Sequence, residues 1–140
     1  MNPKKPRTNC LQCGIENRRP FDTYCSISCH QKYLHNQWII KWLSGEIEGG
    51  DKYGEVSEHV RRYFKDTYGE QCQRCGWNER HSVTGKVPLT FDHVDGDCRN
   101  HRFENLMMLC YNCHALTSTF GALNKKSSRV YPNRGKNKAP

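Results

Sequence analysis

Apolar residues fall into short patterned segments that predict helices in the first half of the chain and strands in the second. Residues 30–44 and residues 57–68 repeat apolar side chains every three or four positions, a spacing typical of amphipathic helices. Residues 87–91 alternate as a strand does, and the apolar run at 106–109 is too short for a helix of its own. A last helix is expected over residues 111–121. The order strand, loop, strand, helix predicts a small α+β unit.

These patterns also predict which side chains face inward. They are Leu34, Trp38, Ile39, Trp42 and Leu43 in the first helix, Val60, Tyr63, Phe64 and Thr67 in the second, and Ala115, Leu116 and Phe120 in the third. Ser57 is a suitable N-cap for the second helix, and Gly69 is a suitable stop. Residues 45–55 contain four glycines and are predicted to be a flexible hinge.

Nine cysteines dominate the candidate chemistry, and eight of them form four close pairs. Two such pairs complete a tetrahedral zinc shell. The expected structural zinc ligands are Cys10, Cys13, Cys25 and Cys29 at one site, and Cys72, Cys75, Cys110 and Cys113 at the other. Cys98 has no pair and is expected to be a free thiol. The chain begins without the apolar core of a secretory signal, so a cytoplasmic location with reduced thiols is expected instead of disulfides.

A metal-stapled fold also suits the composition. Only 35% of the 140 residues are hydrophobic, below the ~45–50% common in globular proteins. Bound zinc would stabilise the folded state of a chain whose apolar core is small. No segment approaches the ~20 apolar residues of a membrane helix, so a membrane protein is not expected.

The net charge of +8 is concentrated at the two ends of the chain. Residues 1–20 carry +4 and residues 124–140 carry +6, whereas the residues between them carry −2. Basic arms on a nearly neutral centre favour binding to the phosphate backbone of a nucleic acid. The alternative is that the arms only keep the protein in solution.

Three segments of the second half together form a motif. They are Asp92-His93-Val94-Asp95-Gly96-Asp97, Asn100-His101-Arg102-Phe103-Glu104-Asn105-Leu106 and Leu109-Cys110-Tyr111-Asn112-Cys113-His114. In this order, and preceded by a Cys-x-x-Cys pair, they resemble the HNH nuclease motif of the zinc-stapled kind found in phage-encoded and homing endonucleases. The resemblance covers residues 72–124 strongly and extends more loosely to residues 42–46 and 61–63.

The resemblance implies a role for each motif residue. Asp92 and His114 match the protein ligands of a catalytic divalent ion, Mg²⁺ or Mn²⁺ ahead of other transition metals. His93 matches the general base that activates water, and Asn105 matches the residue that ties down the polar loop and orients the base. The implied partner is double-stranded DNA. The expected DNA contacts, in the loop and in the tail, are Arg99, Arg102, Lys125, Lys126 and Arg129.

The patterns and the resemblance together give the expected organisation. Residues 1–30 form a basic leader and a four-cysteine zinc finger, and residues 31–69 form a helical linker region. Residues 70–123 form the HNH core with its own four-cysteine zinc site, and residues 124–140 form a basic flexible tail. The expected fold class is α+β, a small zinc-stapled ββα-metal core preceded by helices and an N-terminal zinc finger.

The leading hypothesis is an HNH endonuclease, a hydrolase of phosphodiester bonds, encoded by a phage or a mobile element and acting in the host cytoplasm. The alternatives are a non-catalytic zinc-finger protein that binds nucleic acid, or a phage packaging-associated factor. The complete set Asp92, His93, Asn105 and His114 favours the enzyme, because a binding protein needs only the cysteines and the basic arms. A monomer and a homodimer both fit the sequence.

Several residues keep a second interpretation. His30 and His114 follow zinc-ligand cysteines, and each could replace its neighbour in the zinc shell. Asp95 and Asp97 could join the catalytic ion, although turn formation is the ordinary role of such loop residues. His101, between two arginines of the loop, could hold a phosphate or remain solvated.

Overall fold

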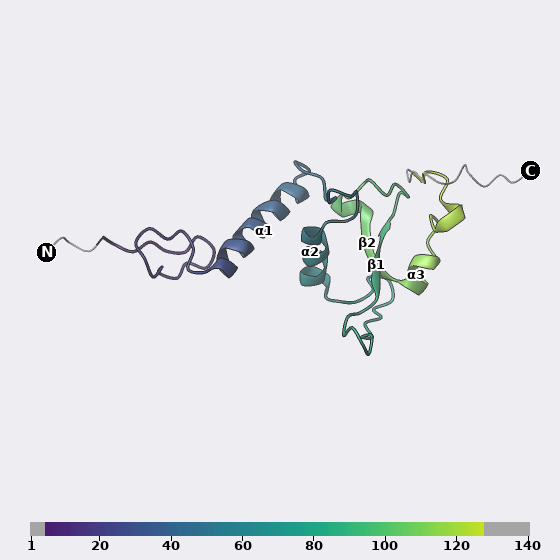
Figure 1. Ribbon diagram of the computed structural model, residues 1–140. Helices are drawn as coiled ribbons and strands as arrows, with labels where there is room; N and C mark the ends of the chain where they lie inside the picture. The colour runs from purple at the N-terminus through teal and green to yellow at the C-terminus, as the bar shows by residue number, and fades with distance from the viewer. Residues whose placement is uncertain (1–4, 128–140) are drawn as a thin grey trace, which may run out of the picture. The chain divides into compact units, whose positions relative to one another are not determined.

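The computed structural model describes residues 5–127, which divide into two compact units, one ending at Glu46 and the other beginning at Ile47. The first unit contains α1 (Ile27–Leu43). The elements of the second unit are α2 (Glu58–Tyr68), β1 (Leu89–His93), β2 (Leu106–Cys110) and α3 (Tyr111–Ala115), with 3₁₀ turns at Phe103–Asn105 and Gly121–Leu123. Figure 1 shows β1 and β2 side by side between α2 and α3. The helical region predicted over residues 31–69 is therefore divided between the two units.

Helix α1 begins at Ile27, three residues before the predicted start. Ser26 is extended, and its hydroxyl accepts a hydrogen bond from the N–H of Cys29 (3.2 Å), which caps the first turn. Among the side chains predicted to face inward, the buried ones are Ile39 and Trp42 and the exposed ones are Leu34 and Leu43. Apolar residues lie on more than one side of α1, so no single buried stripe can hold all of them.

Helix α2 has the caps that its sequence predicts. The Ser57 hydroxyl accepts a hydrogen bond from the N–H of Val60 (3.4 Å), and Gly69 ends the helix with a φ of 77°. Val60 and Phe64 are fully buried. The ring of Phe64 meets that of Phe91 edge-on, with 5.1 Å between centroids, so α2 packs on β1.

Strands β1 and β2 form an antiparallel hairpin in which His93 lies opposite Leu106. Because α3 follows β2 directly, the predicted order strand, loop, strand, helix and the α+β class are confirmed. Strand β1 begins at Leu89, two residues later than predicted, since Pro88 has no N–H to donate to a partner strand. The strand also runs two residues further than predicted, so it includes Asp92 and His93.

Helix α3 has five residues, although a helix over residues 111–121 was predicted. The Thr117 N–H and hydroxyl both lie within hydrogen-bond distance of the His114 carbonyl (3.1 and 2.9 Å) and close a tight turn there. A Thr hydroxyl that competes in this way ends a short helix. Ala115 and Leu116, predicted to face inward, are exposed.

The glycine-rich segment that was predicted to be a flexible hinge contains a hydrogen-bonded loop. Gly50 and Val56 form an antiparallel bridge, and the Asp51 carboxylate accepts hydrogen bonds from the N–H groups of Tyr53 (2.8 Å) and Glu55 (3.0 Å). These N–H groups hold the pKa of Asp51 below its ordinary value. Hydrogen bonds within the segment therefore close the loop over residues 50–56.

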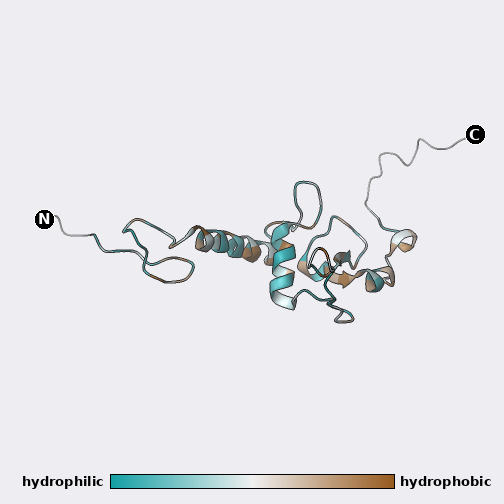
Figure 2. Cartoon of the chain, turned by 60° about the horizontal axis from the view of Figure 1, so that its bottom comes forward, coloured by the Kyte–Doolittle hydropathy of each residue, from teal (hydrophilic) through white to brown (hydrophobic). Residues whose placement is uncertain are grey.

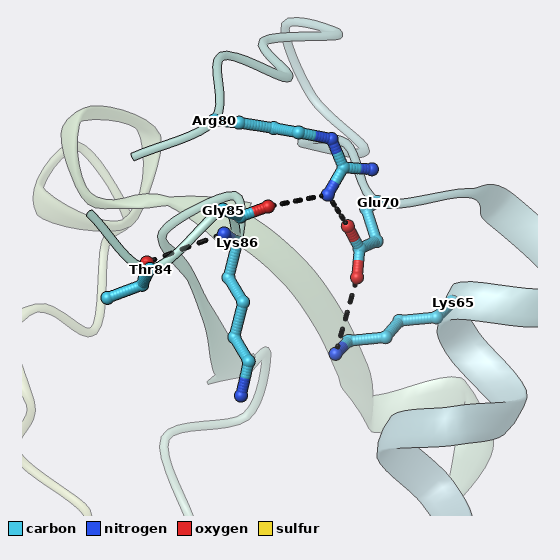
Figure 3. Close-up of polar contacts among 6 residues, drawn as sticks. All are labelled: Lys65, Glu70, Arg80, Thr84, Gly85 and Lys86. Atoms are coloured by element: carbon cyan, nitrogen blue, oxygen red, sulfur yellow. Dashed lines mark hydrogen bonds and ion pairs between the residues drawn. The ribbon is translucent and has the colours of Figure 1, made fainter. Parts of the chain in front are cut away.

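A second loop, residues 76–88, leads to β1 and is attached to the end of α2. Arg80 donates hydrogen bonds to the Glu70 carboxylate (2.6 Å) and to the Gly85 carbonyl (2.8 Å), and Lys65 of α2 lies 3.6 Å from the other Glu70 oxygen (Figure 3). The hydrogen bond from Arg80 lowers the pKa of Glu70. These groups are partly exposed, so they set the position of the loop more than they stabilise the fold.

The apolar residues of the second unit gather on the hairpin. Figure 2 shows one strand of the hairpin in brown and α2 largely in teal. One core cluster contains Cys72, Leu109, Cys110 and Cys113, with Leu89 packed against it. Within residues 5–127, no helix combines the length and the apolar character needed to cross a membrane.

Candidate active site and metal centres

Both predicted tetracysteine clusters are formed, and in each the four sulfur atoms lie within 4.8 Å of one another. The N-terminal cluster contains Cys10, Cys13, Cys25 and Cys29, and the hairpin cluster contains Cys72, Cys75, Cys110 and Cys113. Four thiols at this spacing, with no other type of donor, are the ligand set of a structural zinc site. Cys98 belongs to neither cluster.

The hairpin cluster is built from two turns that direct backbone N–H groups inward. The turn from Cys72 to Cys75 is closed by the N–H of Gly76, which donates to the Cys72 carbonyl (2.8 Å), and Gly76 has a φ of 75°. Cys110 ends β2 and caps α3, where its sulfur accepts a hydrogen bond from the N–H of Cys113 (3.4 Å). Strand and helix thus meet at the cluster.

The thiols of each cluster differ in acidity. Burial raises the pKa of Cys72, but the backbone N–H groups around its sulfur outweigh burial and lower it to about 6. Burial and the neighbouring thiols raise the pKa of Cys113 to about 12. In the N-terminal cluster, backbone N–H groups lower the pKa of Cys10 to about 6 against the effect of burial, and neighbouring thiols raise that of Cys25 to about 12. Four thiolates therefore require a cation between them, which fits bound Zn²⁺.

Asp92, His93 and His114 line one cavity of about 240 Å³. The cavity lies between the end of β1 and the segment after α3, and its walls include Cys98 and Phe120. Asp92 is only 7% exposed, and its Oδ1 lies 3.4 Å from Nε2 of His114. Three of the predicted site residues therefore meet, although His114 is far from the other two in sequence.

The pair of Asp92 and His114 fits a divalent cation. One group is a carboxylate at the end of a strand, and the other is an imidazole on the helix that follows the hairpin. These two side chains would hold such an ion, which would supply positive charge next to a bound phosphate. A carboxylate combined with an imidazole suits Mn²⁺ and related ions, and a site with few protein ligands also suits Mg²⁺.

Two residues after α3 support this pair and were not identified from the sequence. The Thr117 hydroxyl lies 3.4 Å from Oδ1 of Asp92, and the ring of Phe120 meets that of His114 edge-on at 5.3 Å. Neither residue belongs to the motif, and the long predicted helix placed Phe120 on an inner face. The short α3 is what brings both of them back to the cavity.

His93 is held by another histidine. Its Nε2 lies 3.0 Å from Nδ1 of His101, and Nε2 of His101 lies 3.1 Å from the Gly54 carbonyl oxygen. His101 is 5% exposed, so a phosphate contact, one of its two sequence interpretations, does not fit its position. Solvation, the other interpretation, does not fit either.

Asn105 is buried and organises the loop between the strands. Its amide donates to Oδ1 of Asp95 (2.9 Å) and to the Asn100 carbonyl (2.8 Å), and its oxygen accepts from the Asp95 N–H (2.9 Å). Burial raises the pKa of Asp95, but hydrogen bonds from Asn100, Asp97 and Asn105 outweigh it and hold that pKa below its ordinary value. Asp97 accepts from the N–H of Arg99 (3.0 Å). Both aspartates are therefore used in turns of the loop.

The remaining predicted positions lie on the surface or outside the described residues. The exposed DNA-contact candidates are Arg99, Arg102, Lys125 and Lys126, whereas Arg129 lies outside residues 5–127. His30 stacks on Tyr24 (4.5 Å between centroids) and is not in the N-terminal cluster, which uses Cys29. His114 is likewise absent from the hairpin cluster, which uses Cys113.

Comparison with known proteins gives two matches. Residues 72–119 match the family described as HNH endonuclease. The curated H-N-H endonuclease F-TflIV of Escherichia phage T5 is 39% identical over 57 residues, which are 39% of this chain and 23% of the relative. The match thus spans less than a quarter of the relative's length. No solved structure matches the chain.

Proposed function

We propose that this chain, whose residues 72–119 belong to the HNH endonuclease family, is a metal-dependent endonuclease that hydrolyses phosphodiester bonds of duplex DNA. In this proposal His93 is the general base, and Asp92 and His114 hold one divalent ion. The two tetracysteine clusters hold structural Zn²⁺. The observation that carries the proposal is that a candidate base and a carboxylate–imidazole pair line the same cavity.

Hydrolysis requires a water oxygen to attack phosphorus while its proton leaves. His93 accepts that proton at an unprotonated ring nitrogen. As the new P–O bond forms, the bond between phosphorus and the 3′ oxygen breaks, and the leaving oxygen takes a proton from solvent. His93 then returns its proton to solvent, so atoms and charges balance over one cycle.

When bound, a divalent ion supplies charge stabilisation to the phosphorus oxygens and to the leaving oxygen. Asp92 and His114 would hold this ion, and Asn105 orders the loop beside them. Asp92 is shielded from water, so its negative charge is screened little. His114 is restrained by the ring of Phe120 and by the turn that closes α3. Asn105 acts indirectly, because its three hydrogen bonds fix the loop that begins directly after His93.

The exposed arginines of the same loop support a nucleic acid as substrate. Arg99 and Arg102 are exposed in the segment that joins β1 to β2, and the chain continues into basic residues 124–140. Positive side chains of this kind bind phosphates on both sides of a reacting group. The similarity to a phage protein supports a phage or mobile-element origin. A homing-like role remains part of the proposal.

The test is incubation of the zinc-loaded chain with supercoiled plasmid in Mg²⁺ or Mn²⁺. We expect relaxed or linear product from the wild type and a loss of about 10²–10⁴-fold in rate for His93→Ala. His59→Phe, a substitution in α2 outside the cavity, is the control and should cut as the wild type does. A His93→Ala protein that cuts at the wild-type rate would leave DNA binding without catalysis as the better account.

A further inference from the structure

His101 is a buried histidine between the candidate base and a distant loop of the second unit. It touches His93 on one side and the Gly54 carbonyl on the other. We propose that His101 is a positioning residue, which holds His93 in the tautomer that has its proton on Nε2 and its lone pair on Nδ1. This inference rests on the proposed function, because it concerns the nitrogen with which the base accepts a proton.

The assignment follows from counting protons along this chain of contacts. A carbonyl oxygen only accepts, so Nε2 of His101 must carry a hydrogen to bond Gly54 at 3.1 Å. The assignment takes His101 as neutral, because its ring is buried, although the Asp51 carboxylate interacts with it and favours the charged form; a neutral imidazole carries a single proton. Nδ1 of His101 is therefore an acceptor. The partner 3.0 Å away, Nε2 of His93, must be the donor.

The loop over residues 50–56 is shaped to present this carbonyl. Asp51 accepts hydrogen bonds from two N–H groups of the loop, and the N–H of Gly54 donates to the Asp51 carbonyl (3.1 Å). Gly54 has a φ of 79°, which favours glycine at this position. At Gly50, an added Cβ would lie only 2.8 Å from the His101 ring, so this position allows the close approach of the ring. Gly50 thus leaves room for the His101 ring, and Gly54 gives the loop the backbone conformation that presents its carbonyl to that ring.

The tautomer has a consequence for the hydrolytic step. When Nδ1 of His93 accepts the proton of the attacking water, Nε2 keeps its own proton and its bond to His101. That bond then has a charged donor, and charge-assisted hydrogen bonds are stronger than neutral ones. His101 therefore fixes which ring nitrogen of His93 accepts the proton.

The first test needs no catalysis. Ring nitrogen spectra of the ¹⁵N-histidine-labelled, zinc-loaded chain report which nitrogen of each histidine carries hydrogen, and His93→Gln assigns the His93 signals by their loss. We expect His93 protonated at Nε2 and His101 protonated at Nε2 only. A His93 protonated at Nδ1, or a His101 protonated at both nitrogens, would overturn the proposal even if plasmid cleavage is robust.

The second test compares two variants in cleavage. His101→Phe keeps the ring volume but removes the acceptor, and we expect kcat to fall about 10–100-fold with unchanged KM for DNA, together with mixed His93 tautomers. His101→Gln retains an amide that can accept from His93 and donate to Gly54, so most of the rate should return. Wild-type kcat in His101→Phe would also overturn the proposal. If His101→Phe fails to fold, the wild-type spectrum and the Gln variant still decide. If the wild type cuts no DNA, the proposed function fails while the tautomer remains measurable.

Discussion

The two tetracysteine clusters use the same donors in different surroundings. In the N-terminal cluster, 11 residues separate Cys13 from Cys25, and within residues 5–29 only Cys10 and Asn17 are buried. In the hairpin cluster, 34 residues separate Cys75 from Cys110, and they include a strand, a loop and a second strand. The first cluster therefore closes a short segment, whereas the second holds a sheet to a helix.

This difference explains why the candidate active-site residues accompany only one of the clusters. Cys113 of the hairpin cluster is followed directly by His114, and the strand that leads into the hairpin ends at Asp92 and His93. A zinc ion that fixes the junction of β2 with α3 also fixes where His114 lies relative to Asp92. In the N-terminal cluster, the corresponding His30 packs on Tyr24 instead.

The largest effect is expected from breaking one cluster at a time. Cys75→Ser and Cys13→Ser each remove an exposed second cysteine of a Cys-x-x-Cys pair, so they form a matched pair. Cys75→Ser should unfold the second unit and abolish cleavage, because its core is built on the cluster. Cys13→Ser should leave cleavage at saturating DNA nearly unchanged. Plasmid assays and elemental analysis measure both.

The wild type should hold two zinc ions per chain and each of these variants one. One zinc ion or none in active wild-type protein would contradict the assignment of both clusters. Equal loss of cleavage in the two variants would contradict the division of tasks between them.

The next effect separates the base from the metal ligands. His93→Ala should lower cleavage about 10²–10⁴-fold while the binding of Mn²⁺ persists. Asp92→Ala or His114→Ala should weaken Mn²⁺ binding, and raised Mn²⁺ should restore part of the rate. Calorimetric titration with Mn²⁺ measures the difference. Unchanged Mn²⁺ affinity in both ligand variants would remove these residues from the ion site.

A smaller loss is expected at Asn105. Asn105→Ala removes three hydrogen bonds from the loop after β1, so His93 is held less accurately. Misplacement near 1 Å can cost on the order of 10²-fold in rate. Asn112→Ala, an exposed residue of α3, is the control and should leave the rate unchanged. A wild-type rate in Asn105→Ala, measured on plasmid, would contradict the orienting role.

The basic ends of the chain should affect binding more than chemistry. Replacing the six Lys and Arg of residues 124–140 with Gln should reduce the slope of log K against log salt by up to about 5. Replacing the three Lys and Arg of residues 1–9 with Gln should reduce the same slope by up to about 3. Binding isotherms at several salt concentrations measure both slopes. Unaltered slopes would indicate arms that only keep the protein in solution.

The smallest effect is expected at the loop before β1. The pKa of Glu70 is lowered in the folded chain, chiefly by Arg80, so the contact stabilises the fold above the unfolded pKa of ~4.3. That stabilisation disappears as pH falls through the folded pKa. Glu70→Gln should lower the free energy of unfolding by less than about 1 kcal/mol at pH 7 and by nothing at pH 2. Thermal unfolding at both pH values checks this. An equal loss of stability at pH 7 and pH 2 would show that Glu70→Gln acts through packing and not through the ion pair.

The parts of the site that could be predicted lie in local sequence signals. Cysteine spacing predicted both clusters, and the Ser57 and Gly69 caps predicted α2, because each rule concerns residues a few positions apart. The contact between His101 and the Gly54 carbonyl could not be predicted, since it joins positions 47 residues apart. Its only signal is a glycine-rich loop, which by composition alone indicates flexibility.

The predicted helix over residues 111–121 failed for a different reason. The apolar spacing of this segment suits a helix. The Thr117 hydroxyl, however, donates a hydrogen bond to the His114 carbonyl and closes a turn that ends the helix there. Phe120 then turns toward His114 instead of continuing a helical stripe. Periodicity describes what a segment can form, and the neighbouring strand and cavity decide what it does form.

The brevity of α3 has a consequence for the life of the protein in a cell. Five residues cannot maintain a helix alone, because a helix this short does not repay the cost of its first turn. With the proposed zinc in the hairpin cluster, the position of His114 is fixed only after that ion has bound. Under the proposed function, newly synthesised chains would be harmless to the DNA around them until zinc has been loaded, so the supply of this metal would set the delay between translation and cutting.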